Sequence, residues 1–373
     1  MILMVDARTM GSQPSGIGMY LYNFLKEIVK APEIRLVLVS DVATSSEILD
    51  MKERGVEILL YGKKVFRSGG VFAYFNYVRK QAKKYQPDLF WEPNILIPLP
   101  MHGYHGKIVL TIHDIFPITA AENYGIIYRI YFRFLLNKSI KQADLILYDS
   151  DFSKKETEKY SKPARKKKNF LTYVIINKEQ KSELNQSNFD NDYFLYVGYL
   201  GKRKGTDILI KAYEAYVQMG GCRKLYLAGG VNDQSVIDLL EETNAKLQGA
   251  NKATIEYLGY VSKERKAELI ENCACFLFPS RAEGFGMPII EVMEYYRPVI
   301  ASDLEIFKEL IGDAIGYYQH SDDIALDVDN LAKAMYQFVG GQQIDLNVYD
   351  EVLERYRAEK LGPPMIQCLL ASV

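Results

Sequence analysis

The chain has 373 residues, of which 48% are hydrophobic and 25% charged, and its formal net charge is −1. This length predicts two domains or more, with enough apolar residues for two cores. A net charge near zero excludes a strong overall field that would attract nucleic acid or acidic substrates. The four cysteines are too few for a disulfide framework at this length.

The beginning of the sequence and its hydropathy bear on location. No apolar stretch reaches the roughly 18 residues that a membrane-spanning helix needs. Met1 leads directly into a strand-like run containing Asp6, unlike a secretory signal. We therefore expect a cytoplasmic protein. Cys273 and Cys275 lie in an apolar run without the paired spacing of zinc ligands, so we interpret them as buried thiols.

Strand-like runs alternate with helical patterns through the first half of the chain. The predicted strands are Ile2–Val5, Arg35–Ser40, Glu57–Leu60, Leu89–Trp91, Lys107–Ile112 and Leu145–Tyr148. The helical patterns cover Met19–Lys30, Val71–Tyr85 and Tyr124–Gln142. Ser153 followed by Glu156 is typical of a capping box that opens another helix. Strands that are apolar on both faces and alternate with helices predict a parallel sheet with helices on both sides.

The composition changes between residues 161 and 192. A basic run, Arg165–Lys168, precedes a β-like stretch, Phe170–Ile176, and a polar tract, Asn177–Asp192. Because few apolar residues are available there, we expect part of this segment to be a linker or exposed loop. A second alternating series follows, with predicted strands Phe194–Val197, Lys224–Ala228, Ile255–Leu258, Cys275–Pro279 and Val299–Ser302. The sequence therefore predicts two α/β domains that bind ligands at the carboxyl ends of their sheets.

The segment from residue 278 to 303 is the most informative part of the sequence. It carries two carboxylates, Glu283 and Glu291, eight positions apart. Gly286 allows close backbone approach, and Pro288 suits the first turn of a helix whose free N–H groups would form an anion site. Carboxylates accept hydrogen bonds from hydroxyls, so the pair beside an anion site predicts a nucleotide sugar as ligand. The alternative is that both glutamates are merely exposed helix residues.

Two further motifs follow predicted strands. Gly16-Ile17-Gly18 precedes the first long helix and could approach a phosphate, although a plain turn explains it equally well. It is not the longer glycine fingerprint of dinucleotide sites, which argues against NAD. Arg203 and Lys204 lie between a strand end and a helix start, where they could neutralise a diphosphate. The alternative for these two cations is a solvated basic turn.

One histidine has a position that favours function. His113 directly follows the strand Lys107–Ile112 and would face the ligand-binding edge of the sheet. The other histidines, His102, His105 and His320, have no metal-ligand spacing with carboxylates, so we predict no metal site.

Together these motifs resemble the GT-B glycosyltransferases of retaining family 4, in order and over nearly the whole chain. The segments that carry the resemblance are Ser15–Tyr20, Thr111–Pro117, Ser150–Ser153, Tyr196–Gly198, Arg203–Gly205, Leu258–Ser262 and Pro279–Glu291. The last of them matches the Glu-x7-Glu motif of the family. Two departures are Tyr199, where many members have arginine, and Ile176-Asn177-Lys178 in place of the usual Asn-Gly-x-Asp.

The resemblance implies an architecture of two Rossmann-like, doubly wound parallel-sheet domains that face a cleft. The acceptor domain would cover residues 1–175 and the nucleotide-sugar donor domain residues 176–355. A helix in residues 356–373 would return to pack on the N-terminal domain.

The resemblance also assigns the donor-binding residues. The backbone of Gly16 and Gly18 would meet the donor phosphates, and Arg203 and Lys204 would hold the diphosphate. Glu291 would bind the ribose hydroxyls, and Val261 would flank the base. Glu283 would hydrogen-bond the transferred sugar beside the backbone of Phe285, Gly286 and Met287. His113 would lie near the reacting centre, where the departing phosphate takes the proton of the acceptor.

The implied activity is that of a metal-independent, retaining hexosyltransferase with no resident cofactor. It would move a hexose from a nucleoside diphosphate sugar to a glycan or lipid-linked acceptor in polysaccharide or glycoconjugate biosynthesis. A sugar-nucleotide epimerase on the same fold is an alternative, disfavoured by the ordered match around Arg203 and Glu283. A phosphorylase would need a pyridoxal phosphate lysine that no motif identifies. A non-catalytic partner subunit should have lost the donor-site charges, which this chain keeps.

Two predicted helices mix aromatic with basic residues. They are Val71–Tyr85 and Tyr128–Lys141. Such helices can lie on anionic bilayers, which would place the protein at the inner face of a membrane. The alternative is that their aromatic residues belong to the core. For Trp91, which ends a strand beside a possible acceptor loop, we favour core packing over stacking on a sugar.

Overall fold

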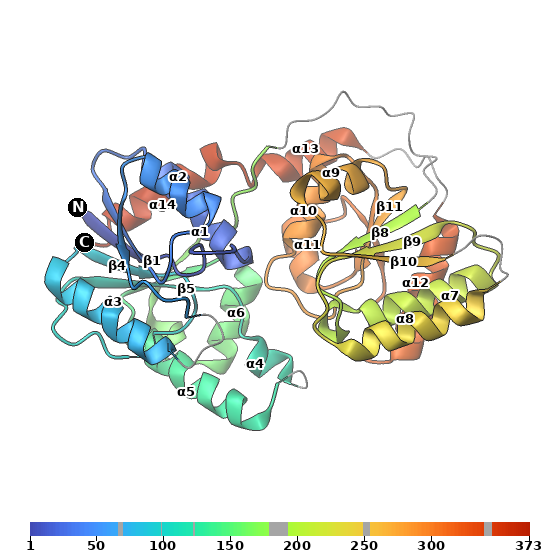
Figure 1. Cartoon of the computed structure of the whole chain (residues 1–373), viewed down its shortest axis with the longest axis horizontal. Helices are drawn as coiled ribbons and strands as arrows, with labels where there is room; N and C mark the ends of the chain where they lie inside the picture. Colours follow the sequence, from blue (N-terminus) through green and yellow to red (C-terminus); the bar gives the residue numbers. More distant parts are fainter. Residues whose placement is uncertain (66–69, 98, 122–123, 179–192, 249–253, 339–344) are drawn as a thin grey trace. The chain divides into compact units, whose positions relative to one another are not determined.

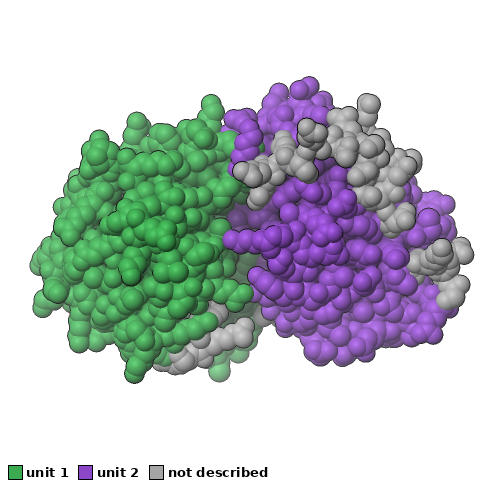
Figure 2. All heavy atoms as spheres, turned by 45° about the horizontal axis from the view of Figure 1, so that its top comes forward, with its two compact units in different colours: residues 1–177, 355–373 green, residues 178–354 purple. Residues whose placement is uncertain are grey.

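The chain folds into two compact units. The computed structural model describes residues 1–65, 70–97, 99–121, 124–178, 193–248, 254–338 and 345–373. Unit 1 contains Met1–Asn177 and Arg355–Val373, and unit 2 contains Lys178–Glu354 (Figures 1 and 2). Each unit has a parallel sheet with helices packed against it, which confirms the predicted fold class of two α/β domains. Most of the predicted polar tract, residues 179–192, lies outside the described residues.

Unit 1 has a seven-stranded parallel sheet in the order β3-β2-β1-β4-β5-β6-β7. Its strands are β1 (Ile2–Asp6), β2 (Arg35–Ser40), β3 (Glu57–Leu60), β4 (Leu89–Glu92), β5 (Lys107–Ile112), β6 (Leu145–Tyr148) and β7 (Lys168–Leu171). Its helices include α1 (Gly16–Ile28), α2 (Ser46–Glu53), α3 (Val71–Tyr85), α4 (Phe116–Thr119), α5 (Ile126–Gln142) and α6 (Asp151–Tyr160). The order reverses between β1 and β4, because the chain returns there to the other side of β1.

Two local predictions in unit 1 are corrected by the structure. α6 is capped by Ser150, whose hydroxyl accepts the Ser153 N–H at 3.0 Å, so Ser153 lies within the first turn and is not the cap. The predicted strand at Phe170–Ile176 is instead β7, which begins at Lys168. As an edge strand, β7 exposes Lys168 and Asn169, so it lacks the continuous apolar run of a central strand.

Residues near the carboxyl end of the chain complete unit 1. α14 (Ala358–Leu370) packs against α1 and buries Met365 and Leu369 completely. Gly362 allows this contact, since a Cβ there would lie 3.0 Å from the Cγ atom of Glu27. The Ile176 N–H donates to the Tyr356 carbonyl at 2.9 Å and ties the returning chain beside the last residues of the first segment.

Unit 2 has a six-stranded parallel sheet in the order β10-β9-β8-β11-β12-β13. Its strands are β8 (Tyr193–Val197), β9 (Lys224–Ala228), β10 (Ile255–Gly259), β11 (Cys275–Phe278), β12 (Val299–Ser302) and β13 (Gly316–Tyr318). Its helices include α7 (Thr206–Gln218), α8 (Gln234–Leu247), α9 (Lys263–Glu271), α10 (Met287–Glu294), α11 (Glu305–Ile311), α12 (Ile324–Gln337) and α13 (Leu346–Glu354). Here the strand order reverses between β8 and β11.

Several predictions about buried residues are confirmed. Trp91 is fully buried and donates its indole N–H to the Thr111 hydroxyl at 2.8 Å, so it packs in the core. Cys273 and Cys275 are buried free thiols. Among the described helices, none combines the length and hydropathy needed to cross a bilayer.

Candidate functional site

Charged loop residues meet in unit 2 where its strand order reverses. β8 and β11 are parallel neighbours, so their carboxyl ends share one edge, and open α/β sheets bind ligands at such a point. The loop after β8 holds Arg203 and Lys204 in a short 3-10 helix, η4 (Lys202–Lys204). The loop after β11 holds Glu283. The structure brings these three predicted site residues together.

Gly205 permits the close approach of the two loops. Its φ is +66°, and a Cβ atom there would lie 1.8 Å from the Pro279 carbonyl oxygen. Only glycine satisfies both the backbone conformation and the available space. Beside it, the Arg281 N–H donates to the Arg203 carbonyl at 2.9 Å, so the loops are also joined through their backbones.

Glu283 is held by a cation and a hydroxyl. The Nζ atom of Lys204 lies 2.5 Å from Oε1 of Glu283, and the Ser280 hydroxyl donates to the same oxygen at 2.6 Å. The side chains of Lys204 and Glu283 are 18% and 8% exposed. At this exposure the pair is screened less than a surface ion pair. The carboxylate is therefore fixed in orientation at the edge of the sheet.

The basic turn is attached to the loop of Glu283 and is not a separate solvated turn. Arg203 donates from Nη1 to the Ala282 carbonyl at 2.8 Å. Arg281 makes a bidentate pair with Asp207 in the first turn of α7, with both N–O distances at 2.8 Å. Such planar, two-point pairing is the strong form of an ion pair and keeps the two loops in register.

The start of α10 directly follows the loop of Glu283. Gly286 is the N-cap with φ +90°, and a Cβ there would lie 2.6 Å from the Phe307 ring. Phe285 is buried, and Met287 begins the helix with Pro288 beside it in the first turn. The backbone of these residues therefore has little freedom to move.

Glu291 belongs to a separate contact. It pairs with Lys266 of α9 at 3.0 Å, and both side chains are about one-third exposed, at 37% and 34%. Val261 is half-buried in the connection between β10 and α9, next to the N-cap Ser262. Within the described residues, no hydrogen bond or ion pair links Glu291 to Glu283. The predicted donor residues therefore form two groups.

In unit 1, Gly16 and Gly18 lie inside α1 rather than before it, which corrects the predicted helix start. The Ser15 hydroxyl caps the helix by accepting the Gly18 N–H at 3.2 Å. A Cβ on Gly18 would lie 2.2 Å from the Thr9 carbonyl oxygen. Gly18 thus lets α1 pack closely on the loop that follows β1.

His113 is buried with both ring nitrogens engaged. Nε2 donates to the Pro93 carbonyl at 2.9 Å, and Nδ1 lies 3.1 Å from a carboxylate oxygen of Asp149. The ring meets the Tyr20 ring edge to face, with centroids 4.8 Å apart, and so contacts α1. The Ser153 hydroxyl donates to the His113 carbonyl at 2.6 Å.

The two bonds of His113 fix its proton content. A carbonyl only accepts, so Nε2 must carry a proton, and a second proton must lie between Nδ1 and Asp149. Burial lowers the pKa of His113, but hydrogen bonding and charge from Asp149, with the Pro93 carbonyl, outweigh it and raise that pKa. Burial also raises the pKa of the Asp149 carboxyl. The pair therefore retains its proton to higher pH than a free imidazole would.

A second buried charge cluster in unit 1 escaped the sequence analysis. Arg8 lies 3.5 Å from both Asp6, the last residue of β1, and Glu92, the last residue of β4. Tyr74 donates to Asp6 at 2.7 Å, and the Arg8 guanidinium lies 4.4 Å from the Phe75 ring centroid. Burial and the nearby Asp6 raise the pKa of Glu92 well above its ordinary value. The sequence could have indicated this cluster, because Asp6 and Glu92 are carboxylate residues at the ends of two otherwise apolar strands.

The partners of the predicted site residues were also missed. Asp149 directly follows β6, and His113 directly follows β5. Because these two strands are neighbours, the contact between His113 and Asp149 could have been predicted once the strand order was known. Ser280, which contacts Glu283, lies in the segment Pro279–Glu291 but received no role of its own there. Lys266, which contacts Glu291, has no distinguishing sequence pattern.

Comparison with protein families covers most of the chain. Residues 177–342 match the model described as "Glycosyl transferases group 1", and residues 14–167 match the model "Glycosyltransferase Family 4". O-antigen chain mannosyltransferase B of Escherichia coli is 27% identical over 332 residues, covering 80% of this chain and 82% of that protein. O-antigen chain mannosyltransferase RfbU of Salmonella typhimurium is 30% identical over 215 residues, covering 57% of each.

Solved structures share the fold over the full length. An Anabaena protein, HepE, in complex with UDP-glucose has a TM-score of 0.73 at 18% identity, covering 100% of this chain and 99% of that one. WaaG, a glycosyltransferase involved in lipopolysaccharide biosynthesis, has a TM-score of 0.70 at 13% identity, covering 99% of each chain.

Proposed function

We propose that this chain, which belongs to the group 1 glycosyltransferases of family 4 and has their GT-B fold, transfers a hexose to a glycan or lipid-linked acceptor. The donor would be a nucleoside diphosphate sugar, and the product a polysaccharide or glycoconjugate. Two relatives are named O-antigen chain mannosyltransferases, so mannose is the first sugar to test.

The observation that carries the proposal is the ion pair between Lys204 and Glu283, with Arg203 beside it. A diphosphate entering this edge would attract both cations, and Lys204 would exchange part of its pairing with Glu283 for pairing with phosphate. Glu283, still held by Ser280, would then accept a hydrogen bond from a hydroxyl of the transferred sugar. The first turn of α10 would offer backbone N–H groups to the same ligand.

The second group would bind the nucleoside. Glu291 is about one-third exposed and already accepts from Lys266, so its oxygens are oriented and within reach of ribose hydroxyls. Val261, half-buried in the β10–α9 connection, would lie against the base. Neither contact distinguishes uracil from guanine or thymine by itself.

The proposed reaction retains the anomeric configuration and uses no metal. The bond between C1 of the sugar and the phosphate oxygen breaks, a bond forms between C1 and the acceptor oxygen, and the acceptor proton passes to the departing phosphate. Arg203 and Lys204 would neutralise the charge that develops on the leaving diphosphate. We assign His113 to the acceptor side, where the Asp149 pair holds its ring and proton in place.

The first experiment is thermal stability against a panel of UDP, GDP, dTDP, CMP, ATP and NAD. A ligand at a hundred times its dissociation constant adds about 2.7 kcal/mol to the native state, which raises the melting temperature measurably. Stabilisation by one nucleoside diphosphate is the expected result, and it identifies the base. The sugars of that nucleotide are then tested for transfer. No response to any diphosphate, or a response to NAD alone, would reject the proposed donor site.

We also propose that the chain works at the inner face of a membrane, where a lipid-linked acceptor would be presented. This peripheral contact is independent of the donor chemistry and has its own surface.

A further inference from the structure

α5 of unit 1 exposes an unusual number of large apolar side chains. They form what we name the α5 patch, and their exposed fractions are Ile126 62%, Ile127 82%, Ile130 65%, Tyr131 43% and Phe134 60%. Single exposed apolar residues are common on proteins, but a contiguous set on one helix marks an interaction surface.

The patch follows from how α5 packs. Its buried stripe begins at Phe132, so the preceding turns, Ile126–Tyr131, have no buried residue. Ile127, Ile130, Tyr131 and Phe134 recur at helical spacing along the outer side. α3, which has a similar mixture in sequence, differs because its Tyr74 and Phe75 are buried. Core packing therefore explains Tyr74 and Phe75 of α3, where Phe72 is the aromatic residue left exposed, at 51%, while the apolar residues of the patch need another partner.

Cations accompany the apolar residues on α5. The helix carries Arg129, Arg133, Lys138 and Lys141 and has no aspartate or glutamate. Among the ion pairs of the described residues, none involves these four side chains. Their charge is therefore available to an external anion.

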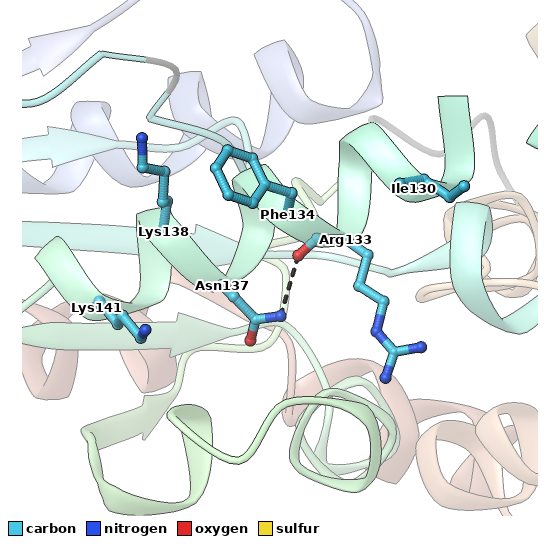
Figure 3. Close-up of a pocket in the computed structure, with 6 residues that line it drawn as sticks. All are labelled: Ile130, Arg133, Phe134, Asn137, Lys138 and Lys141. Carbon is cyan, nitrogen blue, oxygen red and sulfur yellow. Dashed lines mark hydrogen bonds between the residues drawn. The ribbon is translucent and has the colours of Figure 1, made fainter. Parts of the chain in front are cut away.

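A shallow hollow of about 330 Å³ lies at the end of the patch, lined by Ile130, Arg133, Phe134, Asn137, Lys138 and Lys141 (Figure 3). The ammonium of Lys138 lies 5.0 Å from the Phe134 ring centroid. The side-chain amide of Asn137 donates a hydrogen bond to the Arg133 carbonyl at 3.0 Å. An apolar wall with three cations at its rim suits a phosphate group attached to a hydrocarbon chain.

We propose that the α5 patch docks unit 1 on the surface of an anionic phospholipid bilayer. The isoleucines, Tyr131 and Phe134 would enter the interface between headgroups and acyl chains, and the four cations would pair with lipid phosphates. Charge selects this occupant over a second copy of the chain, because pairing two patches would bring four cations against four others. The inference extends the membrane contact proposed above and names the surface and the lipid charge.

The test is co-sedimentation of the full chain with vesicles, without donor or acceptor. One set contains phosphatidylcholine with about one third phosphatidylglycerol, and the other contains phosphatidylcholine alone. We expect binding to the anionic set at low salt, weakened at least about tenfold at about 0.5 M salt because the charges are then screened. The neutral set should bind at least about tenfold more weakly, because it lacks the anionic attraction.

Two double variants test the two components of the patch. Ile127→Ser with Phe134→Ser removes apolar area, and Arg133→Glu with Lys138→Glu reverses charge. Each should weaken binding at least about tenfold. The matched control is Ile324→Ser with Leu326→Ser, which removes two aliphatic side chains, 45% and 44% exposed, from α12 of unit 2. It should bind like the unsubstituted chain.

Every other outcome overturns the proposal. Absence of binding to anionic vesicles removes it, and equal binding by all variants assigns the contact to another surface. Sedimentation equilibrium distinguishes a self-association that the patch variants abolish, which would make a second copy the occupant. Fluorescence of Trp91, buried in unit 1, shows that unit 1 is folded in each patch variant, and circular dichroism shows the same for the control in unit 2. Because the assay involves no transfer step, its failure leaves the proposed transfer untouched.

Discussion

Both units carry charged residues where the strand order of the sheet reverses, but they hold them differently. In unit 1, Asp6 and Glu92 are the last residues of β1 and β4, are buried, and share Arg8. In unit 2, Lys204 and Glu283 lie in the loops that follow β8 and β11 and retain some exposure. The cluster of unit 1 is therefore part of the core, and the cluster of unit 2 lies at the edge of the sheet.

The difference shows that charged residues at equivalent positions of two similar domains can have different roles, depending on whether they lie on a strand or on a loop. Charges on strand ends are locked by the sheet register, so exchanging their partners would require opening the core. Charges on loops can change partners by side-chain rotation, which is what binding a diphosphate requires. We therefore expect substitutions at the loop cluster to impair activity more than stability, and the reverse at buried pairs in unit 1.

The largest expected effect is on transfer. Lys204→Ala should lower kcat/KM by about 100-fold to 1,000-fold, the loss typical of removing one group that stabilises developing charge. Glu283→Ala should lower it by about tenfold to 100-fold, because the transferred sugar loses a charged hydrogen-bond acceptor. Steady-state transfer measures this, and urea unfolding measures stability. Lys246→Ala, which removes an exposed cation of the same unit, is the control and should transfer normally. Unchanged turnover in the Glu283 or Lys204 variant would reject the role of that residue.

The next effect tests whether the loops must touch. Gly205→Ala should lower the free energy of unfolding by about 3 kcal/mol, because it combines a positive φ with a collision against Pro279. The control is Gly312→Ala, where φ is +65° and no atom lies within 4 Å of the added Cβ. That variant should lose only about 1 kcal/mol. If chemical unfolding gave the two variants equal losses of unfolding free energy, the close approach of Gly205 to Pro279 would make no contribution of its own.

A third effect concerns the buried pair in unit 1. The pKa of His113 is raised in the folded state, so its stabilisation is complete below about pH 6.5 and is lost as pH rises through the folded pKa. Asp149→Asn removes the carboxylate that does most to raise this pKa, and burial, which lowers the pKa, is then opposed only by the Pro93 carbonyl and Asp114. We expect the variant to be less stable by about 2 kcal/mol near pH 6, with the difference shrinking toward pH 9.

Urea unfolding followed by Trp91 fluorescence across this pH range measures the difference in unit 1. Asp151→Asn, which removes a more exposed carboxylate from the same unit, is the control and should leave the pH profile unchanged. Parallel profiles for the Asp149 variant and the unsubstituted chain would contradict the coupling.

The smallest effect is expected at the exposed pair. Lys266→Ala should change the free energy of unfolding by less than about 1 kcal/mol, because both partners are about one-third exposed. Glu291→Ala should weaken nucleoside diphosphate binding by about tenfold through the loss of a charged hydrogen-bond acceptor. Calorimetry measures the binding. Equal affinity in the Glu291 variant would remove this residue from the nucleoside site.

The central strands could be predicted because their apolar residues continue on both faces. Arg35–Ser40 and Lys107–Ile112 have the predicted bounds. β13 (Gly316–Tyr318) was missed because three residues show no period, and β7 was misplaced because its exposed lysine and asparagine hide the pattern. Local sequence cannot reveal pairings that depend on the order of strands.

The site residues illustrate the same limit. The sequence indicated loops after two strands for Arg203, Lys204 and Glu283, but not that β8 and β11 would be neighbours and bring them into contact. Likewise, α3 and α5 have similar compositions, and only tertiary packing decided which aromatic residues became core.

The return of α14 to unit 1 has a consequence for synthesis of the chain. Residues 178–354 form one uninterrupted segment, whereas unit 1 is complete only when residues 355–373 have been made. Until then, the face of α1 that α14 covers remains open to water and to chaperones. A truncation before residue 355 would therefore expose apolar surface of unit 1, although most of that unit lies at the other end of the sequence, and we expect the newly made protein to aggregate.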